Sequence, residues 1–310
     1  MTVSGIAVRR VDANAIARIE ISNPPINLVD VRFVAELTAL VDALETDDAV
    51  KVVVFRSALP DYFVNHYDMA PRANGRNPSE RVDQNASDEP ECPRSVRTDR
   101  AGDPRPVCRS VQRVDFDRPS EPLFRLFVRL SRLPQVTIAE IRGRTRGAGS
   151  EFAQALDMRF ASRERALFGQ PEVGIGLHPG AGGTQRLPAL MGRARALEVM
   201  LSGSDYSADV AEQYGWVNRA LPDAEVTGWV DDLAARIASF PAIGLRNVKR
   251  FVNSSFAPAD AALEAEAAAF RETLAHREVR ERLAWLFARG AQLPGDLERD
   301  LGGSLARFGR

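Results

Sequence analysis

A glycine-rich turn followed by a glutamate is the stretch with the clearest chemical potential. The turn is Gly147-Ala148-Gly149 and Glu151 follows it, with a predicted strand before it at 136–141 and a predicted helix after it at 150–156. Amides at such a helix N-terminus favour a bound phosphate or an oxygen that becomes anionic during a reaction. A carboxylate repels phosphate but can move protons, so the combination fits a substrate oxyanion better. Taken alone, however, two glycines more often serve a purely structural turn.

A second group of polar residues follows the predicted strand at 50–55. The turn at 61–69 carries His66 and Asp68. Ligands commonly bind at the carboxyl ends of strands in open α/β sheets, which makes both residues candidates for a site. An ordinary hydrogen-bonded histidine and a helix-capping aspartate are the alternatives.

Residues 179–187 form a second glycine-rich segment, which leads into a predicted helix. It lacks the Gly-Lys-Ser/Thr ending of a phosphate loop and the glycine spacing of a dinucleotide site. The segment therefore gives no independent sign of a nucleotide.

Composition narrows the class of protein. The chain has 310 residues, 45% of them hydrophobic, and a formal net charge of −1, so it can bury one large core or two modest ones. This charge gives no reason to expect nucleic acid or an anionic membrane as a partner. No apolar run is long enough to span a bilayer, and the N-terminus lacks a signal-peptide pattern, so we expect a cytoplasmic protein.

The cysteines and histidines do not predict a metal site. Cys92 and Cys108 share one polar segment and are expected to be free thiols in a reducing cytosol, although a disulfide between them stays open. Only three histidines are present, without clustered Cys/His spacing, so no metal site is expected.

The elements around these residues alternate as in an α/β protein. Apolar periodicity predicts strands at 6–11, 16–21, 50–55, 136–141, 158–161 and 216–221, a strand-like run at 168–176, and helices at 32–45, 123–130, 150–156, 193–201, 207–214, 226–239, 242–253 and 259–289. The long helical tract suggests packing on a neighbouring subunit or a cap on its own core. Residues 293–310 contain Gly and Pro and are expected to fray.

A polar segment interrupts this pattern at about 70–121. Pro, Arg, Asp, Ser and Asn dominate it, and apolar periodicity disappears. Such a composition cannot bury enough apolar surface to form a core. We interpret it as a mobile insertion, and a lid over a pocket and a passive surface loop are equally favoured.

Three blocks together resemble the crotonase superfamily, also called the enoyl-CoA hydratase/isomerase family. They are 147–151, 168–172 and 179–187, flanked by matching signatures at 23–27 and 217–219. The resemblance covers about residues 8–252 apart from the insertion. It implies a spiral of ββα repeats with perpendicular sheets in a core of residues 1–255, followed by a helical oligomerisation region at 256–310.

The resemblance also implies a chemistry. The family binds acyl-CoA thioesters, with coenzyme A as part of the substrate and no other cofactor, and assembles as trimers or dimers of trimers. By position, the oxyanion donors are the backbone N–H groups of Tyr67 and Ala148. Glu151 and Glu172, separated by 172 − 151 = 21 residues, match the glutamates of hydratases. They would share the attacking water, with Glu172 the better donor to Cα.

The residues expected to line the substrate site follow from the same match. They are His66, Asp68, Gly147, Gly149 and Gly180. Lys249 and Arg250 could meet CoA phosphates or form a solvated basic face. Phe287 could line an adenine pocket of a neighbour, although core packing is favoured.

The chain departs from the family at one turn. The family usually reads Ala-Gly-Ala-Asp where this chain reads Asn65-His66-Tyr67-Asp68. A backbone donor survives any side chain, but Tyr67 is large and His66 replaces a glycine, so either the acyl pocket is reshaped or the donor is displaced. His66 could also donate to the substrate.

Retention of both glutamates favours an enoyl-CoA hydratase. A double-bond isomerase, which needs one carboxylate, a thioester hydrolase and a non-catalytic subunit of the same fold are the alternatives. The sequence leaves open the acyl chain, the stereochemistry and the oligomer size.

Overall fold

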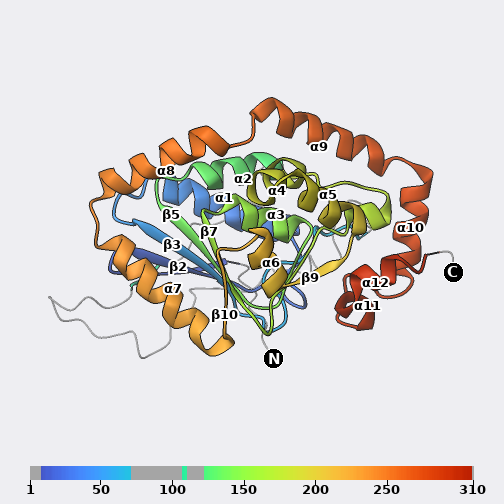
Figure 1. The fold of residues 1–310 in the computed structure, drawn as a ribbon, viewed down its shortest axis with the longest axis horizontal. Helices are drawn as coiled ribbons and strands as arrows, with labels where there is room; N and C mark the ends of the chain where they lie inside the picture. The colour runs from blue at the N-terminus through green and yellow to red at the C-terminus, as the bar shows by residue number, and fades with distance from the viewer. Residues whose placement is uncertain (1–7, 71–106, 110–121, 309–310) are drawn as a thin grey trace, which may run out of the picture.

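A seven-stranded mixed sheet forms the centre of the molecule. The computed structural model describes residues 8–70, 107–109 and 122–308. The strand order is β10-β7-β5-β3-β2-β1-β4 (Figure 1). The neighbours from β2 to β10 pair in parallel, whereas β1 pairs antiparallel with both β2 and β4. The strands are β1 (Val8–Ala13), β2 (Ile16–Ile21), β3 (Val52–Ser57), β4 (Val107–Arg109), β5 (Val136–Ile141), β7 (Met158–Ser162) and β10 (Arg219–Leu221).

A three-stranded sheet continues from the large one. It contains β6 (Arg144–Arg146), β8 (Leu167–Gly169) and β9 (Asp205–Ser207), in the order β6-β8-β9. The chain passes from β5 to β6 through Gly143, whose φ is +78°. A Cβ at this position would lie 2.2 Å from the backbone of Asp61, so only glycine permits this close turn between the sheets.

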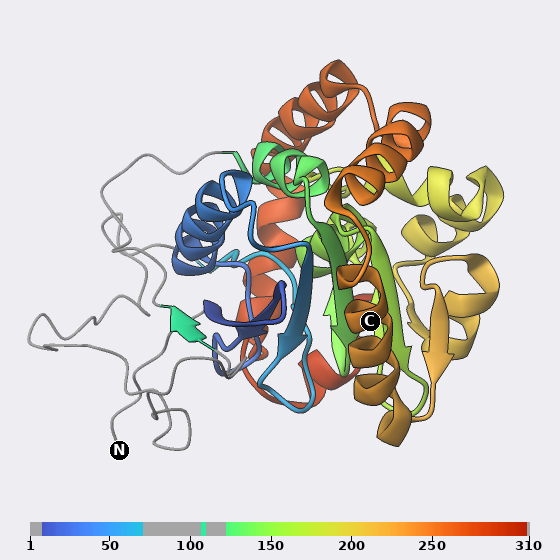
Figure 2. The same ribbon diagram turned by 90° about the vertical axis from the view of Figure 1, so that its left-hand side faces the viewer.

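Helices cover both faces of the large sheet. α1 (Val31–Glu45), α2 (Leu123–Arg132) and α3 (Ala148–Ala155) lie on one face, and α7 (Asp223–Ala238) lies on the other (Figures 1 and 2). The buried side of α7 packs on Val52, Val54 and Ile138. This two-sided burial explains why the strand around 50–55 is continuously apolar.

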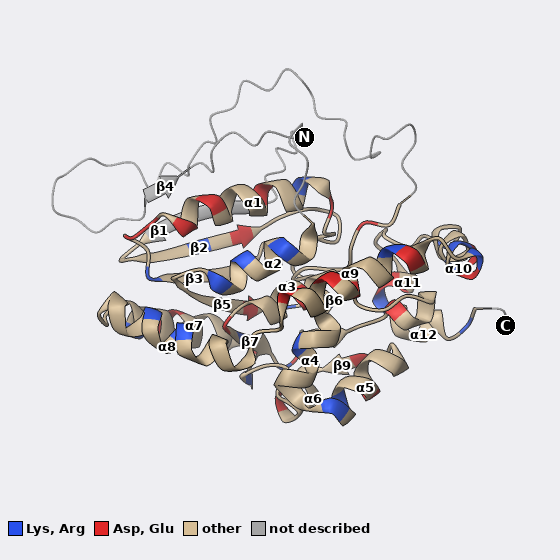
Figure 3. Ribbon diagram, turned by 90° about the horizontal axis from the view of Figure 1, so that it is seen from above, with Lys and Arg blue, Asp and Glu red and all other residues tan. Residues whose placement is uncertain are grey.

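Ion pairs join the two helices on the outer layer. α1 carries acidic residues and the neighbouring α2 carries basic ones (Figure 3), and Arg129 pairs with Asp42 at 2.6 Å and with Glu45 at 2.8 Å. These pairs are partly exposed, so each contributes only about 0–1 kcal/mol. The packing of the apolar faces therefore holds this layer.

The remaining helices surround the small sheet and the rim of the molecule. η2 (Glu172–Ile175, a 3₁₀ helix), α4 (Gly183–Met191), α5 (Arg193–Ser202) and α6 (Ala208–Tyr214) follow β8 and β9. The C-terminal helices are α8 (Ala242–Phe256), α9 (Asp260–Leu274), α10 (Arg277–Phe287), α11 (Asp296–Arg299) and α12 (Leu301–Leu305). They arc around the outside and return toward the small sheet (Figure 1). No helix in the described ranges is long and apolar enough to cross a membrane.

Several predicted boundaries are wrong for identifiable reasons. The helix after the glycine turn begins at Ala148, before the predicted residue 150. The strand-like run at 168–176 is a short strand followed by η2, which starts directly after Pro171. The helix expected over 259–289 is two helices, because the backbone at His276 is extended, with ψ at 140°.

The expectation that 293–310 frays is also wrong. Leu301 and Leu305 are buried against Leu286, and Glu298 is fully buried. The segment has few apolar residues, but Leu301 and Leu305 form part of a pocket wall. No sequence pattern predicts this wall. The predicted division after residue 255 falls at the end of α8 and stays a prediction.

Part of the segment at 70–121 is ordered, contrary to its composition. Residues 107–109 form β4 and extend the large sheet by pairing with β1. Backbone hydrogen bonds can add an edge strand without any apolar pattern. Cys92 and the proposed lid lie outside the described residues.

Candidate active site

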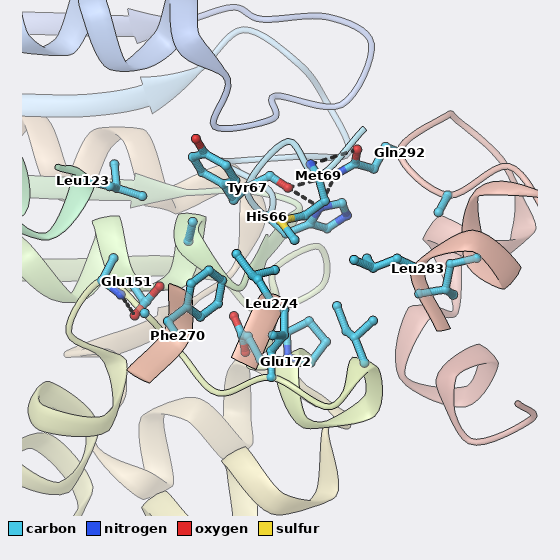
Figure 4. Close-up of a pocket in the computed structure, with 18 of the residues that line it drawn as sticks. His66, Tyr67, Met69, Leu123, Glu151, Glu172, Phe270, Leu274, Leu283 and Gln292 are labelled. Carbon is cyan, nitrogen blue, oxygen red and sulfur yellow. Dashed lines mark hydrogen bonds between the residues drawn. The ribbon is translucent and has the colours of Figure 1, made fainter. Parts of the chain in front are cut away.

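One pocket brings the predicted catalytic residues together. A cavity of about 420 Å³ is lined by Tyr67, Ala148, Glu151, Glu172 and Gly180. Figure 4 shows both glutamate side chains on the opposite side of the pocket from the segment that carries His66 and Tyr67. Most of the other lining residues are apolar, and α9, α10 and α12 contribute several of them. The two glutamates and the residues that carry the two predicted amides therefore line one largely apolar pocket.

The two predicted oxyanion donors lie on adjacent loops. A Cβ added at Gly147 would lie 3.0 Å from Cβ of His66, so the residues that precede Ala148 and Tyr67 are in contact. Neither the Tyr67 amide nor the Ala148 amide donates a hydrogen bond to any residue in the described ranges. Ala148 is the first residue of α3, where a helix presents unpaired N–H groups. Both amides therefore lack an acceptor in the part of the chain that the structure describes.

The glycines and Asp68 have different positions. Gly180 lines the pocket, where an added Cβ would lie 2.6 Å from the Phe270 ring. Gly147 and Gly149 are not among the described residues that line it, but Gly149 lets α3 approach the backbone oxygen of Val64, which an added Cβ would meet at 1.9 Å. Asp68 is also absent from the described lining, and its carboxylate accepts a hydrogen bond from the Ala70 amide at 3.0 Å.

Glu151 is held by the glycine-rich turn before α4. Its Oε1 accepts hydrogen bonds from the amides of Ala181 and Gly183, both at 2.8 Å. Burial raises the pKa of Glu151 well above its ordinary value, and the charges of Glu172 and Glu266 raise it further. The two amides act in the opposite direction without cancelling this shift. The carboxyl is therefore fixed in place and readily protonated.

Glu172 begins η2 and is held by a chain of amide side chains. Gln170 Nε2 lies 3.3 and 3.2 Å from its two oxygens, and Gln154 Nε2 in turn donates to Gln170 Oε1 at 3.2 Å. Burial raises the pKa of Glu172 to about 7, although its own backbone amide, Gln170 and the charge of His66 oppose the rise. A carboxyl with this pKa can give or take a proton near neutral pH.

A third buried carboxylate, Glu266 of α9, was not predicted. Its oxygens accept from the amides of Gly182 at 2.5 Å and Thr184 at 3.2 Å. Successive amides from 181 to 184 therefore bind Glu151 and Glu266 alternately. The buried guanidinium of Arg186 lies beside both acids and donates to Ala181 O at 2.8 Å. In the sequence, Glu266 is one acid among several on an Ala- and Glu-rich helix, so no local signal marks it.

His66 is engaged by the C-terminal segment. Its Nε2 lies 3.1 Å from both oxygens of Glu298, and its Nδ1 lies 3.3 Å from Gln292 Nε2. Burial lowers the pKa of His66, but the Glu298 charge outweighs this and the net shift is upward. Burial likewise opposes ionisation of Glu298, but His66 and its other donors hold the pKa of that carboxyl at about 2. Both ring nitrogens have protein partners, which disfavours the predicted donation to a substrate.

The prediction for Lys249 is wrong, whereas that for Arg250 stays a prediction. Lys249 is buried, pairs with Asp157 at 2.8 Å and donates to Gln135 O at 2.7 Å, so it neither meets CoA nor forms a solvated face. Burial lowers its pKa. Arg250 is exposed and stacks on the Phe251 ring at 4.6 Å. Phe287 lines the pocket of its own chain. Among the described residues, no cluster of His, Cys, Asp or Glu is arranged to hold a metal.

The family described as enoyl-CoA hydratase/isomerase matches residues 108–289, and the chain belongs to it. This confirms the family and the α/β fold predicted from the three motif blocks.

Relatives and solved structures extend the comparison. The short-chain-enoyl-CoA hydratase of Clostridium acetobutylicum is 36% identical over 149 residues, which are 48% of this chain and 57% of that protein. The crotonyl-CoA hydratase of Syntrophomonas wolfei is 34% identical over 173 residues, which are 56% of this chain and 65% of that protein. The matched stretches thus span less than two thirds of these relatives. The crystal structure of a "putative enoyl-CoA hydratase" from Streptomyces avermitilis is 39% identical, covers 100% of both chains and superposes with a TM-score of 0.81.

Proposed function

We propose that the protein is an enoyl-CoA hydratase, which adds water across the α,β double bond of an enoyl-CoA thioester. The observation that carries the proposal is the presence of Glu151 and Glu172 in the same pocket as the free amides of Tyr67 and Ala148. The names of the relatives from Clostridium acetobutylicum and Syntrophomonas wolfei support the same reaction. A role in fatty acid metabolism is part of this proposal.

The amides supply the electrophilic half of the reaction. When water attacks Cβ, negative charge develops on the thioester oxygen and an enolate forms. Two N–H groups directed at that oxygen stabilise the charge, and one such donor is worth about 3 kcal/mol. The apolar lining strengthens each hydrogen bond because it lowers the local dielectric.

The glutamates supply the proton transfers. One carboxylate removes a proton from water while the water oxygen bonds to Cβ, and the other carboxylic acid delivers a proton to Cα. Two buried acids close together cannot both ionise easily, which favours one of each form. Glu172, with a pKa of about 7, is the proposed donor to Cα, and Glu151 shares the attacking water.

The substrate carrier and the assembly belong to the same proposal. Coenzyme A enters as part of the substrate, and Arg271, an exposed cation that lines the pocket, is better placed for its phosphates than Lys249 or Arg250. A homotrimer or dimer of trimers is proposed for a cytoplasmic protein. It is supported by exposed apolar side chains that gather on α8, namely Ile243, Val248, Phe251, Val252 and Phe256.

The test is loss of the conjugated thioester absorbance when the protein is mixed with a panel of enoyl-CoA esters. Hydration that is abolished by Glu151→Gln and by Glu172→Gln supports the proposal. Double-bond migration that survives Glu151→Gln identifies an isomerase, and release of free CoA thiol identifies a hydrolase. Binding without turnover identifies a non-catalytic subunit, and each of these three results contradicts the hydratase.

A further inference from the structure

The short helix α11 contacts both loops that carry the proposed oxyanion amides. Its Glu298 is 0% exposed and places both carboxylate oxygens 3.1 Å from Nε2 of His66, the residue before Tyr67. The backbone oxygen of Glu298 accepts a hydrogen bond from Nη1 of Arg146 at 2.5 Å. Arg146 is fully buried and lies two residues before Ala148. One residue therefore connects the two sides of the hole.

Gln292 adds a second connection from the same segment. Its Nε2 donates to the backbone oxygen of Tyr67 at 2.8 Å, and its Oε1 accepts from the Met69 amide at 3.2 Å (Figure 4). The backbone N–H of Gln292 donates to Oε1 of Glu298 at 2.7 Å. The backbone around Tyr67 and the carboxylate of Glu298 are thus part of one hydrogen-bond network.

Val29 holds the opposite side of the Tyr67 loop. Its amide donates to the His66 oxygen at 3.1 Å, and its oxygen accepts from the Asp68 amide at 3.1 Å. The peptide that contains the Tyr67 N–H is therefore fixed at its carbonyl, and the following peptide is fixed at both ends. Of the N–H and C=O groups in these two peptides, the Tyr67 N–H alone lacks a partner among the described residues.

We propose that Glu298 is a positioning residue, which braces the Tyr67 loop against β6 and so sets the spacing of the two oxyanion amides. The proposal rests on the proposed hydratase function. It also accounts for the departure from the family at residues 65–67, since a histidine there provides the attachment point that glycine lacks. Glu298 lines the same pocket, but its carboxylate is directed to His66. Misplacing a catalytic group by about 1 Å can cost ~100-fold in rate, so a residue that acts through His66 controls turnover.

Three variants test the brace on the full chain. Glu298→Gln keeps the size of the side chain but removes the charge that faces His66, and Gln292→Met removes the donor to Tyr67 O. The matched control is Asp296→Asn in the same turn, because the Asp296 side chain is 100% exposed. We expect Glu298→Gln to lower kcat about 100-fold with KM within ~3-fold, because a misplaced donor weakens transition-state binding rather than ground-state binding. Gln292→Met should lower kcat about 10-fold, and Asp296→Asn should leave both constants unchanged.

Circular dichroism and thermal melting confirm that each variant is folded at the assay temperature. Suppose that the wild type is active and that the folded Glu298→Gln variant keeps kcat within ~3-fold. This result would overturn the brace but leave the proposed hydratase function standing. A rise in KM at unchanged kcat would also overturn it, because that result assigns Glu298 to substrate binding. If Glu298→Gln does not fold, Gln292→Met decides by the same criteria, since it leaves the His66–Glu298 pair in place. A wild type that hydrates no enoyl-CoA overturns the proposed function and the brace together.

Discussion

The two sides of the pocket are held by different means. Glu151 is held by two backbone amides of a glycine-rich turn, those of Ala181 and Gly183. The Tyr67 loop pairs with the backbone of Val29 on one side, and on the other it is held by side chains of Gln292 and Glu298, more than 220 positions further along the chain. Amides are present whatever the side chains are, whereas a side-chain brace needs one particular residue at each end. The first arrangement therefore leaves a local sequence signature and the second does not.

The largest expected effect is on the side of the pocket that carries the two glutamates. Glu151→Gln and Glu172→Gln should each lower the hydration rate by about 10²–10⁴-fold, because each removes a proton-transfer group. The measurement is kcat with a short enoyl-CoA, beside the brace variants. If Glu151→Gln loses less activity than Glu298→Gln, the glutamates do not carry the chemistry and the comparison between the two sides fails.

The free energy of unfolding tests how closely α3 packs against the segment that leads to Tyr67. Gly149→Ala should destabilise the protein by roughly 3 kcal/mol or more, because the added Cβ would lie 1.9 Å from the backbone oxygen of Val64. Gly228→Ala, within α7 and with nothing within 4 Å of the added Cβ, is the control and should gain about 0.5–1 kcal/mol. The free energy of unfolding in urea is the readout. Equal values for the two variants would contradict the close approach of α3 to the 64–67 segment.

The raised pKa of Glu172 predicts that this buried carboxylate lowers the free energy of unfolding at alkaline pH. Because the folded-state pKa is about 7, above its ordinary 4.5, the stability associated with this group is full below pH 4.5 and is lost as pH rises through 7. Glu172→Gln should therefore be more stable than wild type at pH 8, by up to ~3 kcal/mol, and should lose this advantage at pH 4.5. Glu212→Gln, at an exposed position, is the control. An equal gain at both pH values would show that the effect is not electrostatic.

The smallest expected effect concerns Glu266. Its charge raises the pKa values of both Glu151 and Glu172, while Arg186 and His66 are the nearby groups of opposite charge. Glu266→Gln should therefore lower both pKa values, and the alkaline limb of the kcat/KM profile should move to lower pH. An unmoved profile with reduced thermal stability would assign Glu266 to holding the 181–184 turn and nothing more.

Local pattern was sufficient for most of the core. The strand at 136–141 and the helix at 32–45 follow from alternation and from an apolar stripe, and both appear within one residue of their predicted ends. Glu151 could be selected because glycines mark the turn that presents it, whereas Glu172 was selected through the resemblance of residues 168–172 to the family. These features depend on neighbours in the chain, which a sequence displays directly.

Long-range contacts decided the rest. Glu266, Gln292 and Glu298 lie on helices and turns with no distinctive motif, and their importance comes from burial against residues far away in the chain. The same reason explains why Lys249 was misassigned, since only folding brings Asp157 to it. By itself, the sequence determined the family through its motif blocks and most core elements through apolar periodicity, because motifs and periodicity are local properties, and it predicted the pair of acids. Only the tertiary structure decided what fixes the amide of Tyr67, because the free energy of a buried ion pair depends on which distant groups exclude water around it.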